Sequence, residues 1–328
     1  KSALLEGTEM QSHLLPAPDH GATLMLGHTA AALDLDARTV RLSDGSELGF
    51  DGLIIASGSH ARRLSASSAE YTLRDLDDAT ALRQALATRP EVIVIGGGAL
   101  AMEVASGSAA LGCKVTLIAR RTPMTALVGP FVAEVLADAA CDAGVTIRMA
   151  QEVSVHDAPG GGAAVVLDGE TRLQAPVVVT AIGDDANVSW LADSGLLHDG
   201  QLRVDTRGRV APDVVAAGDV AAVPCATGWA RMPLWTSAIE QAKVAAKALL
   251  HGDAAPELNF QPYFWTEQFG ISLKVCGPLP IAGEPEIVDG DVTERRALLR
   301  WQHADGTATA AALGYRIPVP RLRALTRP

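Results

Sequence analysis

The sequence predicts an α/β protein with buried parallel strands, divided into two or three domains. The chain has 328 residues, which is more than one average domain. Hydrophobic residues make up 48% of it but aromatic residues only 4%, so most of the apolar mass is Ala, Val and Leu. That mixture suits buried parallel strands and closely packed helices. A short β-branched run in the first third of the chain also leads directly into a glycine turn, which is typical of this class.

The glycine turn lies in a strand–turn–helix–strand unit. Residues 91–95 (EVIVI) form a predicted strand, helix 102–111 follows, and a second strand covers 114–118 (KVTLI). This is the βαβ unit of Rossmann-like dinucleotide-binding domains, and the flanking strands make it far more specific than a lone glycine string. Between the first strand and the helix stand the predicted cofactor-binding residues Gly96, Gly98, Ala99 and Leu100, with Gly97 among them and Ala101 as the small residue where helix meets strand. Gly96 permits the turn, and Gly98 lets the backbone approach a pyrophosphate at the helix N-terminus.

The elements that follow complete a nucleotide-binding domain predicted over residues 76–185. They are a helix at 131–143 and strands at 145–149, 163–167 and 177–181, with Gly160–Gly161–Gly162 as a predicted hairpin turn. Strands at 53–56 and 213–217 flank this domain, and both end in small residues. We therefore expect them to belong to one discontinuous domain, over 1–75 and 186–255, which the nucleotide domain interrupts.

A separate C-terminal α+β domain is predicted over residues 256–328. Aromatic residues concentrate at its start, and alternating strands follow: the aromatic positions are Phe260, Tyr263, Phe264, Trp265 and Phe269. Its last part carries seven arginines, from Arg295 to Arg327, against one acid, Asp305, in a chain whose net charge is −11. This basic segment is either a solvated surface or a docking face for an acidic partner.

Composition argues against several classes of function. The net charge of −11 disfavours nucleic acid as a partner, and no apolar run is long enough to predict a membrane span. The four cysteines contain no CxxC pair and the eight histidines no metal-ligand spacing, so neither a redox dithiol nor a metal site is expected. Scattered, unpaired thiols suggest a reducing compartment, and we expect a cytoplasmic protein.

The order of motifs resembles the two-dinucleotide flavoprotein reductases, specifically the FAD-dependent ferredoxin reductases that serve bacterial oxygenases and cytochromes P450, such as the putidaredoxin and rubredoxin reductases. The resemblance covers essentially the whole chain. It rests on the opening Lys1-Ser2 with Leu4 and Leu5, Ala56-Ser57-Gly58-Ser59 with Arg62-Arg63, the glycine turn with Glu103, Thr206-Arg207-Gly208-Arg209, Ala216-Ala217-Gly218-Asp219-Val220, Trp235-Thr236-Ser237-Ala238 and Pro262-Tyr263-Phe264-Trp265. It implies two glutathione-reductase-type nucleotide-binding domains and a C-terminal interface domain.

The resemblance also implies roles for individual residues. Asp219, after Gly218, would hydrogen-bond the flavin ribityl chain, and the turn Ala56, Ser57, Gly58 would pack on the flavin, with Arg62 beyond it. Lys1 and Glu103 would form an ion pair beside flavin N5. Trp235, Thr236 and Trp265 would lie by the ring system and the entry of the electron partner, and Ala238 would offer its backbone N–H to the ring.

In such an enzyme the nicotinamide delivers a hydride to flavin N5, and the reduced flavin passes electrons singly to an acceptor. An acidic [2Fe–2S] ferredoxin fits the arginine-rich C-terminal domain. The coenzyme is NADPH or NADH. The second strand of the βαβ unit ends in Ala119-Arg120-Arg121, without the acid that usually binds the ribose of NAD, so NADPH is slightly favoured.

The sequence departs from the family in two places. Ala181-Ile182-Gly183-Asp184-Asp185-Ala186-Asn187 stands where the family has a glycine-rich stretch and Arg-Pro-Asn, so Ile182 and Gly183 are the expected nicotinamide-side contacts. The chain also starts after the family's N-terminal βαβ unit, so we expect the given residues alone to bind flavin poorly. Two alternatives stay open: a flavin-free protein that binds nucleotide or acts as a scaffold, and a reductase of the same fold for another acceptor.

Overall fold

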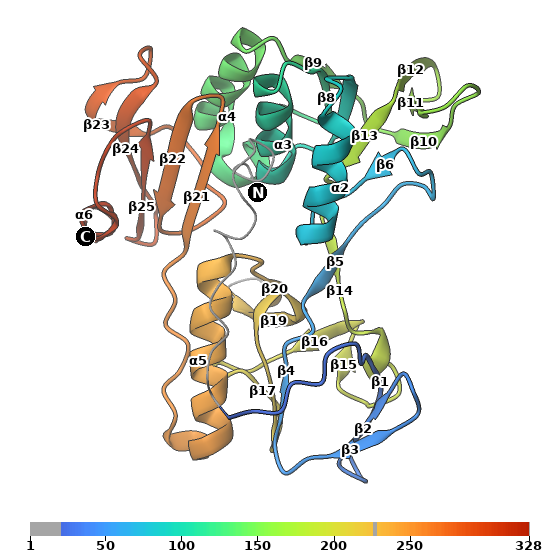
Figure 1. The fold of residues 1–328 in the computed structure, drawn as a ribbon. Helices are drawn as coiled ribbons and strands as arrows, with labels where there is room; N and C mark the ends of the chain where they lie inside the picture. Colours follow the sequence, from blue (N-terminus) through green and yellow to red (C-terminus); the bar gives the residue numbers. More distant parts are fainter. Residues whose placement is uncertain (1–20, 226–227, 328) are drawn as a thin grey trace. The chain divides into compact units, whose positions relative to one another are not determined.

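The computed structural model describes residues 21–225 and 228–327 of the chain (Figure 1). These residues form two compact units. The first comprises 61–184 and 261–327, and the second comprises 21–60 and 185–260. Lys1, Leu4 and Leu5 lie outside the described residues.

The first unit contains a five-stranded parallel sheet at its centre. In spatial order the strands are β6 (Glu70–Tyr71), β13 (Val177–Thr180), β7 (Glu91–Ile95), β8 (Lys114–Ala119) and β9 (Thr146–Met149). The apolar side chains of β7 are buried on both faces of the sheet, as its continuous β-branched run predicts. The four strands predicted here, at 91–95, 114–118, 145–149 and 177–181, are confirmed.

Three helices accompany this sheet: α2 (Leu76–Leu86), α3 (Ala99–Ala110) and α4 (Thr125–Asp142). Ala101, Val104 and Ala105 of α3 are completely buried, so small side chains let this helix approach the sheet closely. The helix starts at Ala99, three residues earlier than 102–111 predicts, because Gly98 already serves as its N-cap. Helix α4 likewise starts before 131 and runs through a kink at Gly129, whose φ is +73° and which precedes Pro130.

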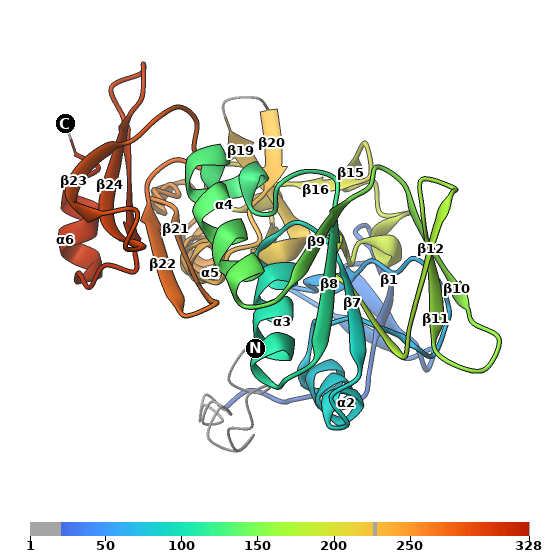
Figure 2. The ribbon, with the colours of Figure 1, turned by 90° about the horizontal axis from the view of Figure 1, so that it is seen from above.

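A small antiparallel sheet covers the face of the parallel sheet opposite to α3 and α4 (Figure 2). Its strands are β10 (Val153–Asp157), β11 (Ala163–Leu167) and β12 (Thr171–Ala175), and the predicted glycine turn joins the first two. Val155, Val165 and Leu167 join Ile93 and Ile95 in one core cluster. Figure 2 shows the small sheet on one side of β7 and β8 and the helices α3 and α4 on the other.

The C-terminal part of the first unit is a five-stranded antiparallel sheet with one short helix, as the predicted α+β pattern requires. In order, the strands are β21 (Tyr263–Gln268), β22 (Ile271–Cys276), β25 (Ala308–Leu313), β24 (Arg296–Gln302) and β23 (Glu286–Asp291), and the helix is α6 (Val319–Ala324). Cys276, Leu298, Ala310 and Leu322 belong to the core between sheet and helix.

The second unit combines small sheets with one long helix, α5 (Trp235–His251). Strands β4 (Leu53–Ile55) and β18 (Val214–Ala216) are parallel neighbours, and β17 (Arg209–Ala211) extends them. This unit also contains the sheet β15 (Leu197–His198), β16 (Gln201–Arg203), β19 (Ala221–Cys225) and β20 (Gly228–Arg231), and the sheet β1 (Ala30–Asp34), β2 (Thr39–Leu42) and β3 (Glu47–Gly49). Its 3₁₀ turns are η2 (Ser189–Leu191), η3 (Gly218–Val220) and η4 (Gly252–Ala254). The paired strands β5 (Ser59–Ala61) and β14 (Asp184–Ala186) lie at points where the chain passes from one unit to the other.

Candidate functional site

The glycine turn of the first unit leaves the N-terminus of α3 open. Gly96 has a φ of +145°, and a Cβ there would lie 2.3 Å from the carbonyl oxygen of Ala181, so only glycine fits. A Cβ on Gly98 would meet nothing within 4 Å, and no side chain caps the helix that starts after it. The first N–H groups of α3 therefore face open space, as an anion site requires.

A cavity of about 560 Å³ lies against this turn, a size within the usual range for a small-ligand site. Seven of the predicted cofactor-binding residues line it: Arg62, Gly96, Gly98, Arg120, Arg121, Ile182 and Gly183. Ala99 and Leu100 begin α3 next to Gly98 but are not among the lining residues. The structure thus brings together residues from four separate stretches of the first unit.

The lining of the cavity is cationic. Arg62, Arg120 and Arg121 contribute guanidinium groups, and none of the described residues that line the cavity is acidic. Gln151 stabilises the backbone at the adjacent residues Arg120 and Arg121, because its Nε2 donates a 3.0 Å hydrogen bond to the carbonyl oxygen of Arg120. Gln151 in turn donates its backbone N–H to Asp168 Oδ1 at 2.9 Å. A cavity of this charge favours a phosphorylated ligand.

Glu103 lies one turn further along α3 and contacts the C-terminal sheet. Its Oε1 accepts a 2.6 Å hydrogen bond from the hydroxyl of Thr266, a buried residue of β21. Trp265, the neighbouring residue, is 44% exposed and stacks on Tyr263 with 5.4 Å between ring centroids. The hydroxyl of Thr266 therefore fixes the Glu103 carboxylate, a contact between residues 163 positions apart that no local motif indicates.

The second unit places another glycine at the end of a parallel strand. Because β4 and β18 run parallel in register, the segments that follow them lie side by side. Ala56, Ser57 and Gly58 follow β4, and Gly218 and Asp219 follow β18. Gly218 has a φ of +81° and donates its N–H to Gln241 Oε1 at 3.0 Å. The five residues predicted to bind flavin from these two strands are therefore neighbours.

Helix α5 begins beside this turn. A Cβ on Gly218 would lie 3.7 Å from the Cβ of Ala238, so the first turn of α5, with Trp235, Thr236 and Ala238, faces Gly218. The backbone N–H of Ala238 donates to the carbonyl oxygen of Leu234 at 3.0 Å, so it is not available to a ligand as the family resemblance implies. The structure therefore brings Gly218 and the residue after it, Asp219, next to the first turn of α5, and a carboxylate at this place is suited to the hydroxyl groups of a ribityl chain.

Asn187 stabilises the turn after β4. Its side-chain Nδ2 donates to the carbonyl oxygen of Ser57 at 2.8 Å, and its own carbonyl oxygen accepts from Ser57 Oγ at 2.9 Å. Its backbone N–H donates to the carbonyl oxygen of Gly58 at 3.0 Å. Asn187 is therefore a positioning residue of this turn, and it stands at the asparagine of the family pattern at 181–187.

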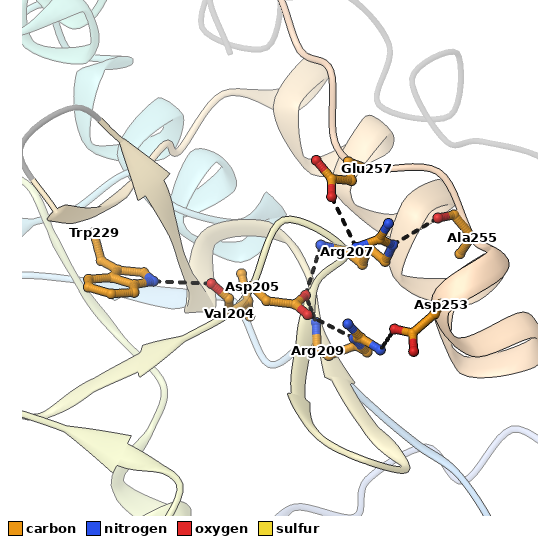
Figure 3. A network of polar contacts seen from close by, with 8 residues as sticks. All are labelled: Val204, Asp205, Arg207, Arg209, Trp229, Asp253, Ala255 and Glu257. Atoms are coloured by element: carbon orange, nitrogen blue, oxygen red, sulfur yellow. Dashed lines mark hydrogen bonds and ion pairs between the residues drawn. The ribbon is translucent and has the colours of Figure 1, made fainter.

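A network of ion pairs supports the strand that carries Gly218 (Figure 3). Asp205 accepts hydrogen bonds from the backbone N–H of Arg207 at 2.8 Å and of Arg209 at 2.9 Å, and from Arg209 Nε at 2.8 Å. Arg209 also pairs with Asp253 at 2.7 Å, and Arg207 pairs with Glu257 at 3.0 Å. The Thr206-Arg207-Gly208-Arg209 motif is therefore structural here: it ties the turn before β17 to the segment after α5.

Asp205 is held in its charged form. Burial alone would raise its pKa, but hydrogen bonds from the backbone and side chain of Arg209 and from the backbone of Arg207 outweigh burial and lower the pKa. The motif alone does not indicate Asp205, because its role depends on acceptor geometry within the folded turn.

The C-terminal arginines fall into three groups. Arg295 pairs with Asp142 of α4, and Arg300 Nε donates to the carbonyl oxygen of Leu325 at 2.9 Å, so both hold the first unit together. Arg296 lies over the ring of Tyr315, and Arg323 lies over the ring of Tyr263. Arg316, Arg321 and Arg327 are exposed. An acidic partner would therefore meet the exposed arginines and those that lie over tyrosine rings, rather than Arg295 and Arg300.

Residues 21–225 and 228–327 contain neither a candidate membrane span nor a candidate metal site. No helix in these ranges is long and apolar enough to cross a membrane, and no cluster of three or more His, Cys, Asp or Glu side chains there could hold a metal ion. Cys113, Cys141, Cys225 and Cys276, all within these ranges, form no disulfide.

Comparison with known proteins identifies relatives along most of the chain. Residues 2–246 match the family model of pyridine nucleotide-disulphide oxidoreductases. The 3-phenylpropionate/cinnamic acid dioxygenase ferredoxin–NAD(+) reductase component of Photorhabdus laumondii is 28% identical over 310 residues, which cover 92% of this chain and 78% of that protein. The ferredoxin–NAD(+) reductase component of the anthranilate 1,2-dioxygenase system of Burkholderia cepacia is 34% identical over 298 residues, with 88% and 72% covered.

A solved structure shares the fold. The crystal structure of the covalent putidaredoxin reductase–putidaredoxin complex superimposes with a TM-score of 0.85 at 27% identity, covering 95% of this chain and 79% of that one. The predicted mixed α/β fold, with a parallel sheet and a C-terminal antiparallel sheet, is therefore confirmed.

Proposed function

The chain belongs to the pyridine nucleotide-disulphide oxidoreductase family, and we propose that it is an FAD-dependent NAD(P)H:ferredoxin reductase of an oxygenase or cytochrome P450 system. The observation that carries this proposal is the cationic cavity at the open N-terminus of α3, which suits the phosphates of a nicotinamide nucleotide. The curated relatives named above, which are ferredoxin–NAD(+) reductase components, support it.

The nicotinamide nucleotide would bind to the first unit. Gly96 and Gly98 give the pyrophosphate access to backbone N–H groups, with Ala99 and Leu100 as the first residues of the helix. Ile182 and Gly183 line the same cavity next to Arg62, whose backbone N–H donates to the carbonyl oxygen of Gly183 at 3.1 Å. These residues bind and orient the coenzyme, and no protein acid, base or nucleophile is needed.

FAD would bind through the second unit. Asp219 suits the hydroxyl groups of the ribityl chain, and the small residues Ala56, Ser57 and Gly58 allow close packing against a flat ring. The N-terminus of α5, with Trp235 and Thr236, would lie by the flavin ring. The backbone N–H of Ala238 donates to the carbonyl oxygen of Leu234 at 3.0 Å, so Ala238 would contribute its small side chain rather than the expected N–H group. Bound FAD supplies the conversion of a two-electron hydride donor into single-electron transfers.

Glu103 is proposed as the residue of the first unit that sets the electrostatics of the flavin, with Lys1 as its partner. Thr266 keeps the carboxylate of Glu103 in place through the 2.6 Å hydrogen bond from its hydroxyl. A fixed charge near a redox group favours one of its ionic forms over the other, which is how such a pair would act.

NADPH is the proposed coenzyme, with NADH as a second donor. The relatives are named for NAD(+), but in this chain the second strand of the βαβ unit ends in Ala119, Arg120 and Arg121. Both arginines line the cavity, and guanidinium groups bind a phosphate with two parallel hydrogen bonds. The 2′-phosphate of NADPH would supply that phosphate.

An acidic [2Fe–2S] ferredoxin is the proposed electron acceptor, and the cytoplasm the proposed location. The exposed arginines Arg316, Arg321, Arg323 and Arg327 lie on and beside α6, and Arg296 is exposed on β24, so these side chains would meet an acidic partner. Trp265, 44% exposed on the same sheet, is the proposed entry for the partner. The domain limits proposed from the sequence, 1–75 with 186–255, 76–185 and 256–328, assign these roles to three domains.

Spectroscopy of the purified chain mixed with FAD tests the proposal. Because the given residues alone are expected to bind flavin poorly, FAD is kept in excess in the buffer. We expect the flavin absorbance to bleach on addition of NADPH only when the protein is present, and to recover when an oxidised [2Fe–2S] ferredoxin is added. Flavin that binds but does not bleach with either coenzyme would overturn the reductase assignment. Protein that binds coenzyme but no flavin would favour the flavin-free alternative, and bleaching without reduction of any ferredoxin would favour another acceptor.

A further inference from the structure

One wall of the coenzyme cavity is a segment without regular structure. Arg62 and Leu64 both line the cavity, and residues 62–69 belong to no helix or strand. The segment is connected to Gly183, which also lines the cavity, because the backbone N–H of Arg62 donates to the carbonyl oxygen of Gly183 at 3.1 Å. A Cβ on Gly183 would lie 3.7 Å from Nη1 of Arg62, so the guanidinium group lies beside Gly183 as well.

A buried carboxylate holds this segment from behind. Glu70, the first residue of β6, is 2% exposed. Its Oε1 accepts the backbone N–H of Leu64 at 2.7 Å, and its Oε2 accepts the backbone N–H of Ser65 at 2.7 Å and the hydroxyl of Ser65 at 2.6 Å. Both carboxylate oxygens therefore accept hydrogen bonds from this segment, one from Leu64, which lines the cavity, and the other from Ser65 next to it.

The backbone around Glu70 reinforces the same contact. Arg63 Nη2 donates to the carbonyl oxygen of Glu70. The side chain and the main chain of Glu70 therefore both accept hydrogen bonds from residues 63–65. Glu70 itself is fixed in the parallel sheet, where it is paired with Val178 of β13. A segment of irregular backbone is thus attached to the rigid sheet through one residue.

Glu70 is charged in this setting. Burial raises its pKa, but the hydroxyl of Ser65 and the backbone N–H groups of Leu64 and Ser65 outweigh burial, so the pKa lies below the ordinary value for glutamate. Hydrogen bonds to a charged acceptor are stronger than those between neutral groups, and a buried charge without them is strongly unfavourable. The carboxylate therefore requires the segment to keep one conformation.

We propose that Glu70 is a positioning residue for the coenzyme: it holds Arg62 and Leu64 in the geometry that nicotinamide nucleotide binding needs. This inference rests on the proposed function, because it takes the cavity as the coenzyme site. Glu70 is not a lining residue, so it acts only through the segment that it holds.

The proposal is tested by the binding constant of NADPH for the purified chain. It is measured from the quenching of NADPH fluorescence, well below the melting temperature of the protein. In Glu70→Gln one acceptor oxygen is replaced by an NH₂ group that faces a donor, and we expect NADPH to bind about tenfold more weakly, as for one lost charge-assisted hydrogen bond. Ser65→Ala removes only the hydroxyl contact, and we expect binding about two- to threefold weaker, in a variant that keeps the carboxylate and both backbone contacts.

Asp78→Asn is the matched control. Asp78 Oδ2 accepts the backbone N–H of Arg74 at 2.7 Å and the hydroxyl of Thr72 at 3.1 Å, the same kind of contact in the same unit, but neither partner lines the cavity. We expect this variant to lose thermal stability without a change in the NADPH binding constant. If the role of Glu70 is purely structural, Glu70→Gln and Ser65→Ala will also lose thermal stability while the NADPH binding constant stays unchanged.

A double-mutant cycle with Arg62→Ala identifies the route of the effect. If Glu70 acts through Arg62, the losses in Glu70→Gln and Arg62→Ala will be less than additive in the double variant. Unchanged NADPH affinity in Ser65→Ala and Glu70→Gln, or full additivity with Arg62→Ala, would overturn the inference. If Glu70→Gln does not fold, the NADPH affinities of Ser65→Ala and of the double variant Ser65→Ala/Arg62→Ala test the inference in its place. Failure of the wild-type chain to bind NADPH or NADH would count against the proposed function instead.

Discussion

Each unit of this protein ends a buried parallel strand in a glycine and starts a helix beside it, yet the two sites keep their shapes by different means. In the first unit the Gly96–Gly98 turn depends on the absence of side chains, because the carbonyl oxygen of Ala181 occupies the place of a Cβ on Gly96. In the second unit the turn at Gly218 depends on side chains that hold it, namely Gln241 and the ion pairs around Asp205.

The difference matches the ligands that the two sites are proposed to bind. A pyrophosphate needs backbone N–H groups and cations without steric hindrance, so small residues and three arginines suffice in the first unit. A neutral ribityl chain and ring need a placed carboxylate and a placed helix N-terminus, so the second unit requires a rigid side-chain framework. Substitutions should therefore act differently in the two units.

The largest effect is expected at the first glycine of the turn. Gly96→Ala would place a Cβ 2.3 Å from the carbonyl oxygen of Ala181 at a φ of +145°, and we expect a loss in the free energy of unfolding of about 3 kcal/mol or more. Thermal denaturation measures it. Gly98→Ala is the control for the same turn: its Cβ meets nothing within 4 Å, so we expect a loss of less than about 1 kcal/mol. Equal losses in both variants would contradict this account of the turn.

The next effect concerns the network of the second unit. Asp205→Asn removes the charge that Arg209 and Arg207 surround, and we expect a loss of about 1–2 kcal/mol, limited by the 40% exposure of the Asp205 side chain. We expect FAD to bind more weakly while NADPH fluorescence quenching is unchanged, because the two ligands use different units. An equal loss of affinity for FAD and for NADPH would contradict the assignment of the two ligands to different units.

The same carboxylate predicts a pH dependence of stability. Because the pKa of Asp205 is lowered in the folded protein, its contribution is complete above the ordinary pKa of aspartate and is lost as pH falls through the folded value. Urea denaturation of the wild type and of Asp205→Asn between neutral and acid pH measures this: we expect the difference between them to shrink at acid pH. A difference that stays constant down to pH values below the folded pKa would refute the role of the charge.

A smaller effect separates the two coenzymes. Arg120→Ala and Arg121→Ala remove one guanidinium each from the cavity, and we expect kcat/KM for NADPH to fall about tenfold while that for NADH changes little. Gln151→Leu removes the hydrogen bond that holds the carbonyl oxygen of Arg120, and a weaker change in the same direction should follow. A wild-type preference for NADH would exclude the proposed 2′-phosphate contact.

The smallest effect is expected on the C-terminal surface. Replacing the exposed Arg316 and Arg321 by Glu should slow reduction of an acidic ferredoxin about two- to tenfold at low salt and leave NADPH-to-dye turnover intact, because surface charge acts mainly on encounter. Arg295→Glu is the contrast, since Arg295 pairs with Asp142. We expect it to lower thermal stability, and a ferredoxin-specific loss in that variant would contradict its structural assignment.

Much of the nucleotide-binding domain could be predicted from the sequence because its signals are local. The run at 92–95 is continuously β-branched, as a strand buried on both faces requires, and Gly96 follows it at the position where the turn has no room for a side chain. The predicted start of the next helix, at 131, is too late because Gly129 and Pro130 usually end or break a helix, whereas in α4 they only kink it.

The positioning residues could not be predicted in the same way. Thr266 lies 163 residues from Glu103 in the chain, and Asn187 lies 130 residues from Ser57, so no spacing rule connects them. Glu70 is the first residue of a strand of only two residues, and nothing in the sequence around it distinguishes it from a surface glutamate. Its burial and its donors exist only once β6 has paired with β13.

The sequence alone therefore determined where the backbone must turn and which strands must be buried, because glycine φ angles and β-branched runs act within a few residues. Only the tertiary structure decided which charges are structural and which face a ligand. Arg295 and Arg316 are identical in sequence terms, and Asp142 lies beside the first of them only after α4 and the C-terminal sheet have folded into one unit. A charge takes its role from the partner that folding brings within hydrogen-bond distance, and that partner is set by packing over the whole unit.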